Sequence, residues 1–372
     1  MASVESRITR RGGREVKVYD VRYRDPDGRQ RRKTFGKKGD ADRFAATVEA
    51  DKIRGQYVDH SDRTTVVEYA RAWAAARPHR PTTARRVSQL IEVHIAGTRL
   101  GDRRLAAARP SEIQAWASDR AQVLAPSTLR NLVSLLRSIY ANAVLDRLVA
   151  SSPVVRVALP RHEQPRVVPL TVEQVQVLAG AMPPRNRAMV LTQAGLGLRV
   201  GELLALRVGD VDFLRRTVRV EWQFAPGAKT RSEPKTPRSR RTIPLPQVVA
   251  DALAQHIAEL PPGDDGTLFT TWTGAPYRHD HYGGAQIFRA AVKRAGLPAG
   301  TSSHDLRHHY ASVLLAAGES VVAVAERLGH ENATLVLTTY GHLMPDSEER
   351  TRRAVDEAWS AIAVPSEQAA QG

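Results

Sequence analysis

The first sixty residues alternate apolar and polar positions, a pattern that is typical of a small sheet. Four apolar residues alternate with polar ones in two phases and predict a kinked strand: Val16, Val18, Val21 and Tyr23. The sequence Asp25-Pro-Asp-Gly28 predicts a turn, because proline presets φ and glycine accepts a positive φ. A second strand over residues 30–35 and a helix over about 40–54 are expected to follow.

Between residues 61 and 155 the apolar residues recur every three or four positions, which is the period of amphipathic helices. This pattern predicts helices over residues 66–75, 83–94, 110–123 and 127–146. We expect Ser127 to cap the last of these helices, with Pro126 ending any helix from upstream.

Prolines interrupt this pattern and indicate an extended linker, which we place at residues 156–169. Beyond the linker, Thr171-Val-Glu-Gln174 matches a capping box and predicts the start of a new helix. The last and largest domain is expected to contain helices over 171–182, 185–195, 199–207, 247–259, 284–295, 304–317, 320–328 and 333–340. A short sheet is expected from residues 217–224, 240–245 and 266–271.

These patterns together predict a multidomain α+β protein. Residues 1–60 are expected to form a small domain of β-sheet and helix, and residues 61–155 an all-α domain. Residues 170–363 are expected to form a mainly α domain with a small antiparallel sheet, followed by a disordered tail at 364–372. At 372 residues the chain is long enough for two or three domains, each with its own core.

The charge of the chain narrows the choice of partner. Lys and Arg number 55 against 39 Asp and Glu, which gives a formal net charge of +16. This balance favours a polyanionic partner over a merely soluble basic protein. A membrane surface is a weaker candidate, because no basic amphipathic helix stands out and no run of eighteen apolar residues exists.

The sequence contains no cysteine, so disulfides and thiolate metal sites are excluded. The N-terminal residues lack the apolar core of a signal peptide, and we expect a cytoplasmic protein. We expect neither a metal nor another cofactor.

Basic residues are dense in the predicted N-terminal sheet. A solvated basic face is one interpretation, but the density within about thirty residues favours nucleic acid. The candidate DNA contacts are Arg10, Arg11, Arg14, Arg22, Arg24, Arg31, Arg32 and Lys33.

Two candidate functional positions precede the C-terminal third of the chain. Arg199 and Glu202 are three residues apart, which predicts one shared helix face, although an ordinary ion pair is the alternative interpretation. Lys235 lies in a predicted hairpin turn before the strand at 240–245. Most turn lysines have no role, and Lys229 competes for the same assignment.

His304 and Arg307 are also three residues apart and are expected to share a helix face, from which both can address one phosphate. His308 and His309 follow directly. A histidine cluster suggests a metal, but the two nearby arginines would repel a cation. We therefore assign no role to His308 and His309.

The segment before Tyr340 carries a further histidine. Gly329 is expected to end a helix and leave His330 at its C-terminus, where carbonyl dipoles favour the imidazolium. Asn332 is expected to cap a short helix that carries Tyr340. A tyrosine at a helix end is usually half-buried packing, so its meaning depends on its neighbours.

In combination, these residues match the needs of phosphodiester cleavage. Arginines are best suited to stabilise charge on the non-bridging oxygens. A phenol with a pKa of about 10 needs a base and a positive field to lose its proton, and the leaving oxygen needs a proton. These roles can be filled without a metal by Arg199, Lys235, His304, Arg307 and His330, with Tyr340 as the nucleophile.

The order and spacing of these motifs resemble the tyrosine recombinase family, of the phage-integrase type, over nearly the whole chain. The resemblance implies that Arg199 and Arg307 clamp the scissile phosphate and that Lys235 is the general acid for the 5′-hydroxyl. Tyr340 would form a 3′-phosphotyrosyl bond without ATP, and strands would exchange through a Holliday junction.

The resemblance also assigns the supporting roles. It implies that His304 is the general base, that His330 stabilises the transition state and that Glu202 supports the site. The polar helix over about 346–361 is where relatives pack against a neighbouring subunit.

The N-terminal half resembles the same family. Residues 1–60 are similar to an arm-type DNA-binding domain, and residues 61–155 look like a helical core-binding, SAM-like domain. The implied partners are double-stranded DNA attachment sites, further copies of this chain in a homotetramer, and a directionality factor or host DNA-bending protein.

The leading hypothesis is a site-specific integrase that inserts a phage or integrative element into a bacterial chromosome. A chromosome-dimer or transposon recombinase is the runner-up, although such chains generally lack the basic N-terminal unit. A type IB topoisomerase and a DNA-binding protein without cleavage activity are further alternatives.

Overall fold

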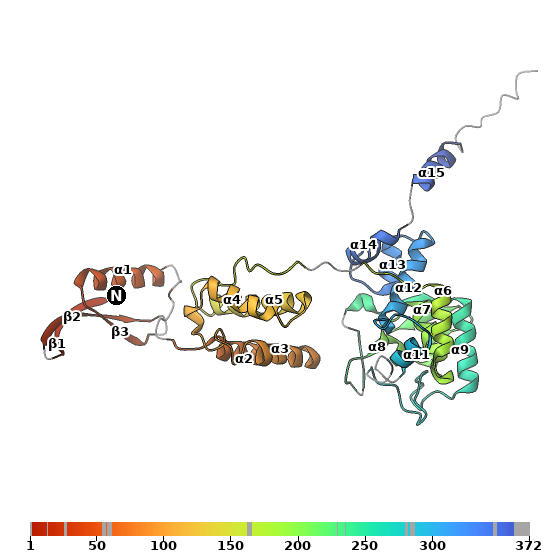
Figure 1. The fold of residues 1–372 in the computed structure, drawn as a ribbon, viewed down its shortest axis with the longest axis horizontal. Coiled ribbons are helices and arrows are strands. Elements are labelled where there is room, and N and C mark those ends of the chain that lie inside the picture. The colour runs from red at the N-terminus through yellow and green to blue at the C-terminus, as the bar shows by residue number, and fades with distance from the viewer. Residues whose placement is uncertain are drawn as a thin grey trace, which may run out of the picture. The chain divides into compact units, whose positions relative to one another are not determined.

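The computed structural model of this chain describes residues 2–12, 14–25, 28–53, 57, 62–161, 166–228, 230–234, 236–279, 282, 287–344 and 348–360. The chain divides into two compact units, Met1–Gln164 and Pro165–Gly372 (Figure 1). The division falls inside the segment 156–169 that was predicted to be a linker. Within the described residues, no helix is both long and apolar enough to cross a membrane.

The chain begins with an antiparallel three-stranded sheet in the order β1-β2-β3 and one helix: β1 (Ser3–Arg11), β2 (Arg14–Arg24), β3 (Gln30–Phe35) and α1 (Lys38–Ile53). Helix α1 covers one face, where Val21 and Tyr23 pack against Ala41 and Val48. Strand β1 was not predicted. Its apolar side chains are few, and Ile8 is 66% exposed, so pairing with β2 rather than apolar alternation defines this strand.

The helical part of the first unit consists of α2 (Val66–Ala76), α3 (Pro81–His94), α4 (Pro110–Ala121) and α5 (Pro126–Leu145). Each predicted helix is present, and the apolar stripes meet in a core that includes Trp73, Ile91 and Leu132. The predicted cap at Ser127 is wrong. Ala125 is the N-cap and Pro126 is the first helical residue, where proline loses no hydrogen bond and its fixed φ suits the helix.

The helices of the second unit build the scaffold around α7. They are α6 (Val172–Ala181), α7 (Pro184–Leu196), α8 (Val200–Ala205), α9 (Gln247–Glu259), α11 (Phe288–Arg294), α12 (Ser303–Ala316), α13 (Val321–Leu328), α14 (Thr334–Tyr340) and α15 (Glu348–Ser360). Helix α7 contacts α6, α9 and α12 (Figure 1). The capping box at Thr171 is confirmed, since its hydroxyl accepts from the Gln174 amide at 3.2 Å and the Gln174 side chain accepts in return at 2.9 Å.

The predicted boundaries shift at several helices. Residues 284–286 of the predicted helix over 284–295, and the tail at 364–372, lie outside the described residues. The short helix that carries Tyr340 has Ala333 at its N-cap position, with no side-chain hydrogen bond there, so the predicted cap at Asn332 is wrong. Arg199 is the N-cap of α8 rather than a residue of its first turn.

The sheets of the second unit are small. Strands β4 (Val211–Asp212), β5 (Thr217–Val220) and β8 (Arg241–Pro244) pair antiparallel in the order β4-β5-β8, while β6 (Gln223–Phe224) pairs with β7 (Arg231–Ser232). The single strand predicted over 217–224 is therefore divided, because its two ends pair with different partners. Residues 266–271 make isolated bridges from Thr267 and Thr270 instead of the predicted strand.

Two glycines fix the backbone on either side of Arg199. Gly197 ends α7 in the left-handed region, with φ of +61°, and lies against the ring of Tyr310. Gly201, in α8, faces the carbonyl oxygen of Phe224 so closely that a Cβ would overlap it. The backbone path through Arg199 therefore depends on two positions without side chains.

We expect Gly201→Ala to lower the free energy of unfolding by about 1–3 kcal/mol, because the added Cβ collides with a backbone oxygen that cannot rotate away. The thermal midpoint of the full chain, followed by circular dichroism, measures the change. The matched control is Gly180→Ala in α6, where a Cβ meets open space and stability should be equal or higher by up to about 1 kcal/mol. Equal midpoints for the two variants would contradict this packing argument.

Candidate active site

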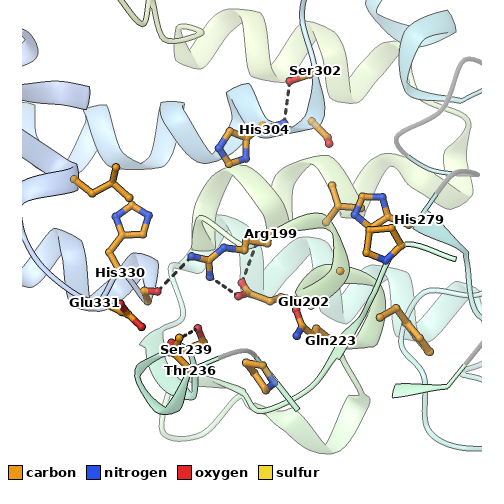
Figure 2. A pocket seen from close by; sticks show the side chains of 18 of the residues that line it. Arg199, Glu202, Gln223, Thr236, Ser239, His279, Ser302, His304, His330 and Glu331 are labelled. Atoms are coloured by element: carbon orange, nitrogen blue, oxygen red, sulfur yellow. Dashed lines mark hydrogen bonds and ion pairs between the residues drawn. The ribbon is translucent and has the colours of Figure 1, made fainter. Parts of the chain in front are cut away.

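A cleft of about 960 Å³ is lined by four of the predicted functional residues, Arg199, Glu202, His304 and His330, whereas Arg307 and Tyr340 do not line it. Arg199 lines it at the start of α8, and His304 lines it from the first turn of α12. His330, which directly follows the end of α13, lines it as well (Figure 2). Thr334, Leu335 and Thr338 of α14 also line it. The cleft thus joins segments that are far apart in the sequence.

Glu202 is a buried carboxylate beneath Arg199. It accepts from the Arg199 amide and from Arg199 Nη1, both at 2.9 Å, and from Arg241 Nη2 at 2.9 Å and Nη1 at 3.2 Å. Burial alone would raise its pKa, but Arg241, and after it Arg199 and Arg307, lower the pKa to about 2. Glu202 is therefore ionised at neutral pH and holds two guanidinium groups in place.

Arg241 is a member of this network that sequence analysis did not single out. Its side chain is 4% exposed, and Nε donates to the carbonyl oxygen of Arg327 at 2.7 Å. Arg241 thereby links β8 to the C-terminal end of α13 as well as to Glu202. Its position just after the predicted turn gave no signal, because its partners come from two distant helices.

Arg307 is also buried, with 1% exposure. Its Nη1 donates to the carbonyl oxygen of Gly197 at 2.7 Å, and Nη2 donates to that of Leu328 at 2.6 Å. Burial and the nearby Arg199 lower the pKa of Arg307 to about 9, which leaves it charged at neutral pH. It places a fixed positive charge directly behind the cleft.

His330 is held by the same arginine. Arg307 Nη2 lies 2.9 Å from His330 Nε2, and a guanidinium can only donate, so Nε2 accepts and the ring proton lies on Nδ1. The expected imidazolium is wrong, because burial together with Arg307, Arg199 and Arg241 lowers the pKa of His330 to about 4. Burial and these charges outweigh the carbonyl dipoles at the end of α13, where the φ of +65° at Gly329 confirms the predicted helix end.

The Nδ1 atom of His330 is buried and has no hydrogen-bond partner among the described residues. A neutral imidazole in this tautomer offers that N–H as a donor. Arg199 and His330 both line the cleft, so an oxygen anion that enters it, such as a phosphate oxygen, meets a guanidinium there, while Nδ1 itself is buried. The cleft is therefore built to receive an anion.

His304 lies on the cleft wall, where the Ser302 hydroxyl accepts from its amide at 3.3 Å. Partial burial, His308 and Arg307 lower the pKa of His304 well below its usual range, so the ring is neutral. Lys235 and its competitor Lys229 lie outside the described residues. Within the described ranges, no three His, Asp or Glu side chains converge as metal ligands do.

Tyr340 lies on the other side of α14. It is 2% exposed and packs in a cluster with Tyr310, Leu315 and Val336, while the hydroxyl lies 2.6 Å from His308 Nδ1. The structure thus brings Tyr340 to α12, one helical turn from His304. Sequence analysis gave His308 no role, although its i,i+4 spacing from His304 was a usable signal.

The N-terminal candidates do not share one face of their sheet. Strand register places four of them on the face away from α1: Arg14, Arg22, Arg24 and Arg32. Arg7, which was not a candidate, lies on this face and donates to the buried Asp20 at 2.7 Å. Finding Arg7 from the sequence required recognising β1 as a strand.

The remaining candidates lie on the opposite face of the sheet, or their side chains lie outside the described residues. Arg10 lies 4.0 Å from Glu15, and Arg31 donates to Asp25 at 3.0 Å. Lys33 lies 4.3 Å from the centre of the Phe44 ring. The side chain of Arg11 lies outside the described residues, so DNA contact by this set stays a prediction.

Proteins with similar sequences match most of this chain. Residues 169–346 match the model of the phage integrase family. Over 332 residues the chain is 30% identical to a putative prophage phiRv2 integrase of Mycobacterium tuberculosis, covering 86% of this chain and 87% of that protein. It is 27% identical over 296 residues to an integrase of Mycobacterium phage FRAT1, covering 78% of this chain and 87% of that one.

Solved structures resemble the fold. The Tn1549 transposon integrase, in complex with transposon right-end DNA, matches with a TM-score of 0.68 at 25% identity, over 80% of this chain and 100% of that chain. A lambda integrase tetramer bound to a Holliday junction matches with a TM-score of 0.62 at 18% identity, over 88% and 93% of the two chains. The predicted α+β fold class is confirmed.

We expect Arg241→Met to lower the free energy of unfolding by about 3 kcal/mol or more, because it leaves the Glu202 carboxylate buried with one guanidinium fewer. Denaturant unfolding of Arg241→Met, Glu202→Gln and the double variant measures the coupling. The control is Arg215→Met, which breaks an exposed pair with Asp212 at 3.8 Å and should change stability by less than about 0.5 kcal/mol. Additive effects at Arg241 and Glu202 would refute the coupling.

Proposed function

The chain belongs to the phage integrase family, and from that premise we propose that it is a site-specific DNA recombinase that integrates or excises an element at attachment sites. One observation carries the proposal. A single cleft combines Arg199, His304 and His330, with Arg307 bonded to His330 from behind. Fixed cations and an unpartnered donor around one space suit a phosphodiester whose charge increases in the transition state.

The proposed roles follow from these positions. Arg199 and Arg307 neutralise the non-bridging oxygens. The Nδ1–H group of His330 donates a hydrogen bond to one of these oxygens. Glu202 holds Arg199 in place. His304 serves as the general base.

The hydroxyl of Tyr340 attacks phosphorus and forms a 3′-phosphotyrosyl bond, while Lys235 gives a proton to the departing 5′-oxygen. The flanking residues Pro234 and Thr236 line the cleft, which supports the assignment of Lys235. The adduct keeps the energy of the broken bond, so a second 5′-hydroxyl can reverse the step without ATP or a metal. Two such exchanges proceed through a Holliday junction.

We assign the proposed roles to the domains in their order along the chain. Residues 1–60 bind arm sites, residues 61–155 and 170–363 bind the core site, and residues 156–169 link them. The complexes of Tn1549 integrase with DNA and of a lambda integrase tetramer with a Holliday junction support a homotetramer on DNA. A directionality factor or a host bending protein would complete the assembly in the bacterial cytoplasm.

A chromosome-dimer recombinase is the second candidate. A tyrosine recombinase XerC of Halalkalibacterium halodurans is 30% identical but covers only 60% of this chain, against 86% for the prophage integrase. The additional coverage favours an integrase. A topoisomerase or a DNA-binding protein without cleavage activity would be distinguished by the experiments below.

Wild-type protein incubated with a nicked attachment-site substrate in EDTA should form a covalent protein–DNA adduct, visible as a shifted band in denaturing gels. Tyr340→Phe should form none, because it lacks the attacking oxygen. The matched control is Tyr277→Phe, which removes another buried phenol of the same unit and should leave adduct formation unchanged. An adduct from Tyr340→Phe would overturn the nucleophile assignment, and an adduct that requires magnesium would overturn metal independence.

Deletion of residues 1–60 should abolish integration between attachment sites but leave cleavage of the isolated core site, because only arm binding is removed. A recombination assay with full attachment sites, run beside the nicked-substrate assay, separates the two activities. A second variant replaces Arg22, Arg24 and Arg32, which share one sheet face, by Gln. It should reproduce the integration defect within the full-length chain. Equal integration by the truncated and full-length proteins would contradict the arm-binding role.

A further inference from the structure

The hydroxyl of Tyr340 has a partner other than the predicted base. Its oxygen lies 2.6 Å from His308 Nδ1, and the two rings meet edge to face with their centroids 5.4 Å apart. Among the described residues, this is the only hydrogen bond of that hydroxyl. His308 comes from α12 and Tyr340 from α14, so the pair also joins these two helices.

His308 lies between the phenol and His304. The His304 and His308 rings, one helical turn apart on α12, have centroids 4.7 Å apart. His304 faces the cleft, whereas Tyr340 is buried on the side of α14 that faces α12. The phenol proton therefore meets His308 before it can reach His304.

The direction of this hydrogen bond follows from the available donors. A buried hydroxyl that has one neighbour gains most by donating its proton to that neighbour. Nδ1 of a neutral imidazole accepts when the ring proton is on Nε2. In that tautomer Tyr340 is the donor and His308 Nδ1 the acceptor, and the proposal below depends on it.

We propose that His308 is the direct acceptor of the Tyr340 proton during strand cleavage and returns it on rejoining, a role that rests on the proposed function. As the bond from Tyr340 Oη to phosphorus forms, the Oη–H proton moves to His308 Nδ1. The bond from phosphorus to the 5′-oxygen breaks, and that oxygen takes a proton from a separate acid, for which Lys235 is proposed. His304 then acts on the phenol only through His308.

Burial of this pair keeps the proton on the phenol at rest. His308 is faced by Tyr340 from α14 and by His304, Asp305 and Arg307 from its own helix. Burial lowers the pKa of His308 and raises that of Tyr340, while Arg307 partly opposes the rise at Tyr340. At neutral pH His308 is an uncharged acceptor, and the transfer accompanies bond formation to phosphorus rather than preceding it.

Two variants separate proton transfer from positioning. His308→Asn retains an acceptor oxygen near the place of Nδ1 but cannot take a proton, and His308→Ala removes both. Adduct formation on the nicked substrate should be about 100-fold slower for both variants at neutral pH. The deficit should shrink as the pH is raised into the alkaline range, where solvent takes over deprotonation of a phenol whose pKa burial holds above its usual range.

If His308→Asn cleaves as fast as wild type while His308→Ala is slow, His308 only positions the phenol and the proposal fails. The control His342→Asn changes a histidine just after Tyr340 that contacts the carbonyl oxygen of Val167, and it should not show this pH-dependent deficit. A substrate with sulfur in place of the bridging 5′-oxygen releases a thiolate, a leaving group that does not need a proton. This substrate should not restore the cleavage rate of the His308 variants. A restored rate would instead show that His308 protonates the leaving group.

The wild-type protein supplies a test that does not depend on variant folding. Nitrogen NMR of labelled histidines should show His308 with an unprotonated Nδ1 at neutral pH, altered in Tyr340→Phe. A protonated Nδ1 would overturn the proposal. An adduct formed by Tyr340→Phe would instead overturn the proposed function, so the two failures are distinguishable.

Discussion

Three successive carbonyl groups at the end of α13 hold three arginines from different parts of the chain. Arg241 donates to residue 327 at 2.7 Å, Arg307 to residue 328 at 2.6 Å and Arg199 to residue 329 at 3.3 Å. The last carbonyls of a helix have no partner within it and carry its negative partial charge. This helix end therefore satisfies its own polar groups by collecting the cations that surround the cleft. Glu202 adds a full negative charge that bonds to two of them, Arg199 and Arg241.

Burial and the concentration of positive charge together favour the neutral form of the histidines. Arg307 is among the causes that lower the pKa of both His304 and His330, after burial itself. Both rings are therefore neutral at rest and can act through their N–H and lone-pair positions. A bound phosphate, being negative, would oppose the arginines and raise both pKa values. Protonation in the cleft thus depends on the substrate as well as on the protein.

Two features that depend on local contacts were predicted correctly, whereas Arg241, whose partners are distant in the sequence, was missed. The capping box at Thr171 and the helix end at Gly329 depend only on neighbouring residues, and both were predicted correctly. Arg241 became apparent only when β8 lay beside α8 and the end of α13. The charge of His330 was predicted wrongly, since the helix dipole was considered without the arginines of other segments.

The three histidines of α12 lie in three different surroundings. His304 and His308 are four residues apart and follow one face, from the cleft to the phenol of Tyr340. His309 is rotated by about 100° and turns to the carbonyl oxygen of Leu170, at 2.7 Å, where the predicted linker meets the second unit. On the far side of Tyr340, His342 reaches the carbonyl oxygen of Val167 at 2.9 Å. Val167 and Leu170, at the end of the predicted linker, are therefore bonded to α12 and to the short 3-10 helix η4 (Gly341–Leu343) that directly follows Tyr340.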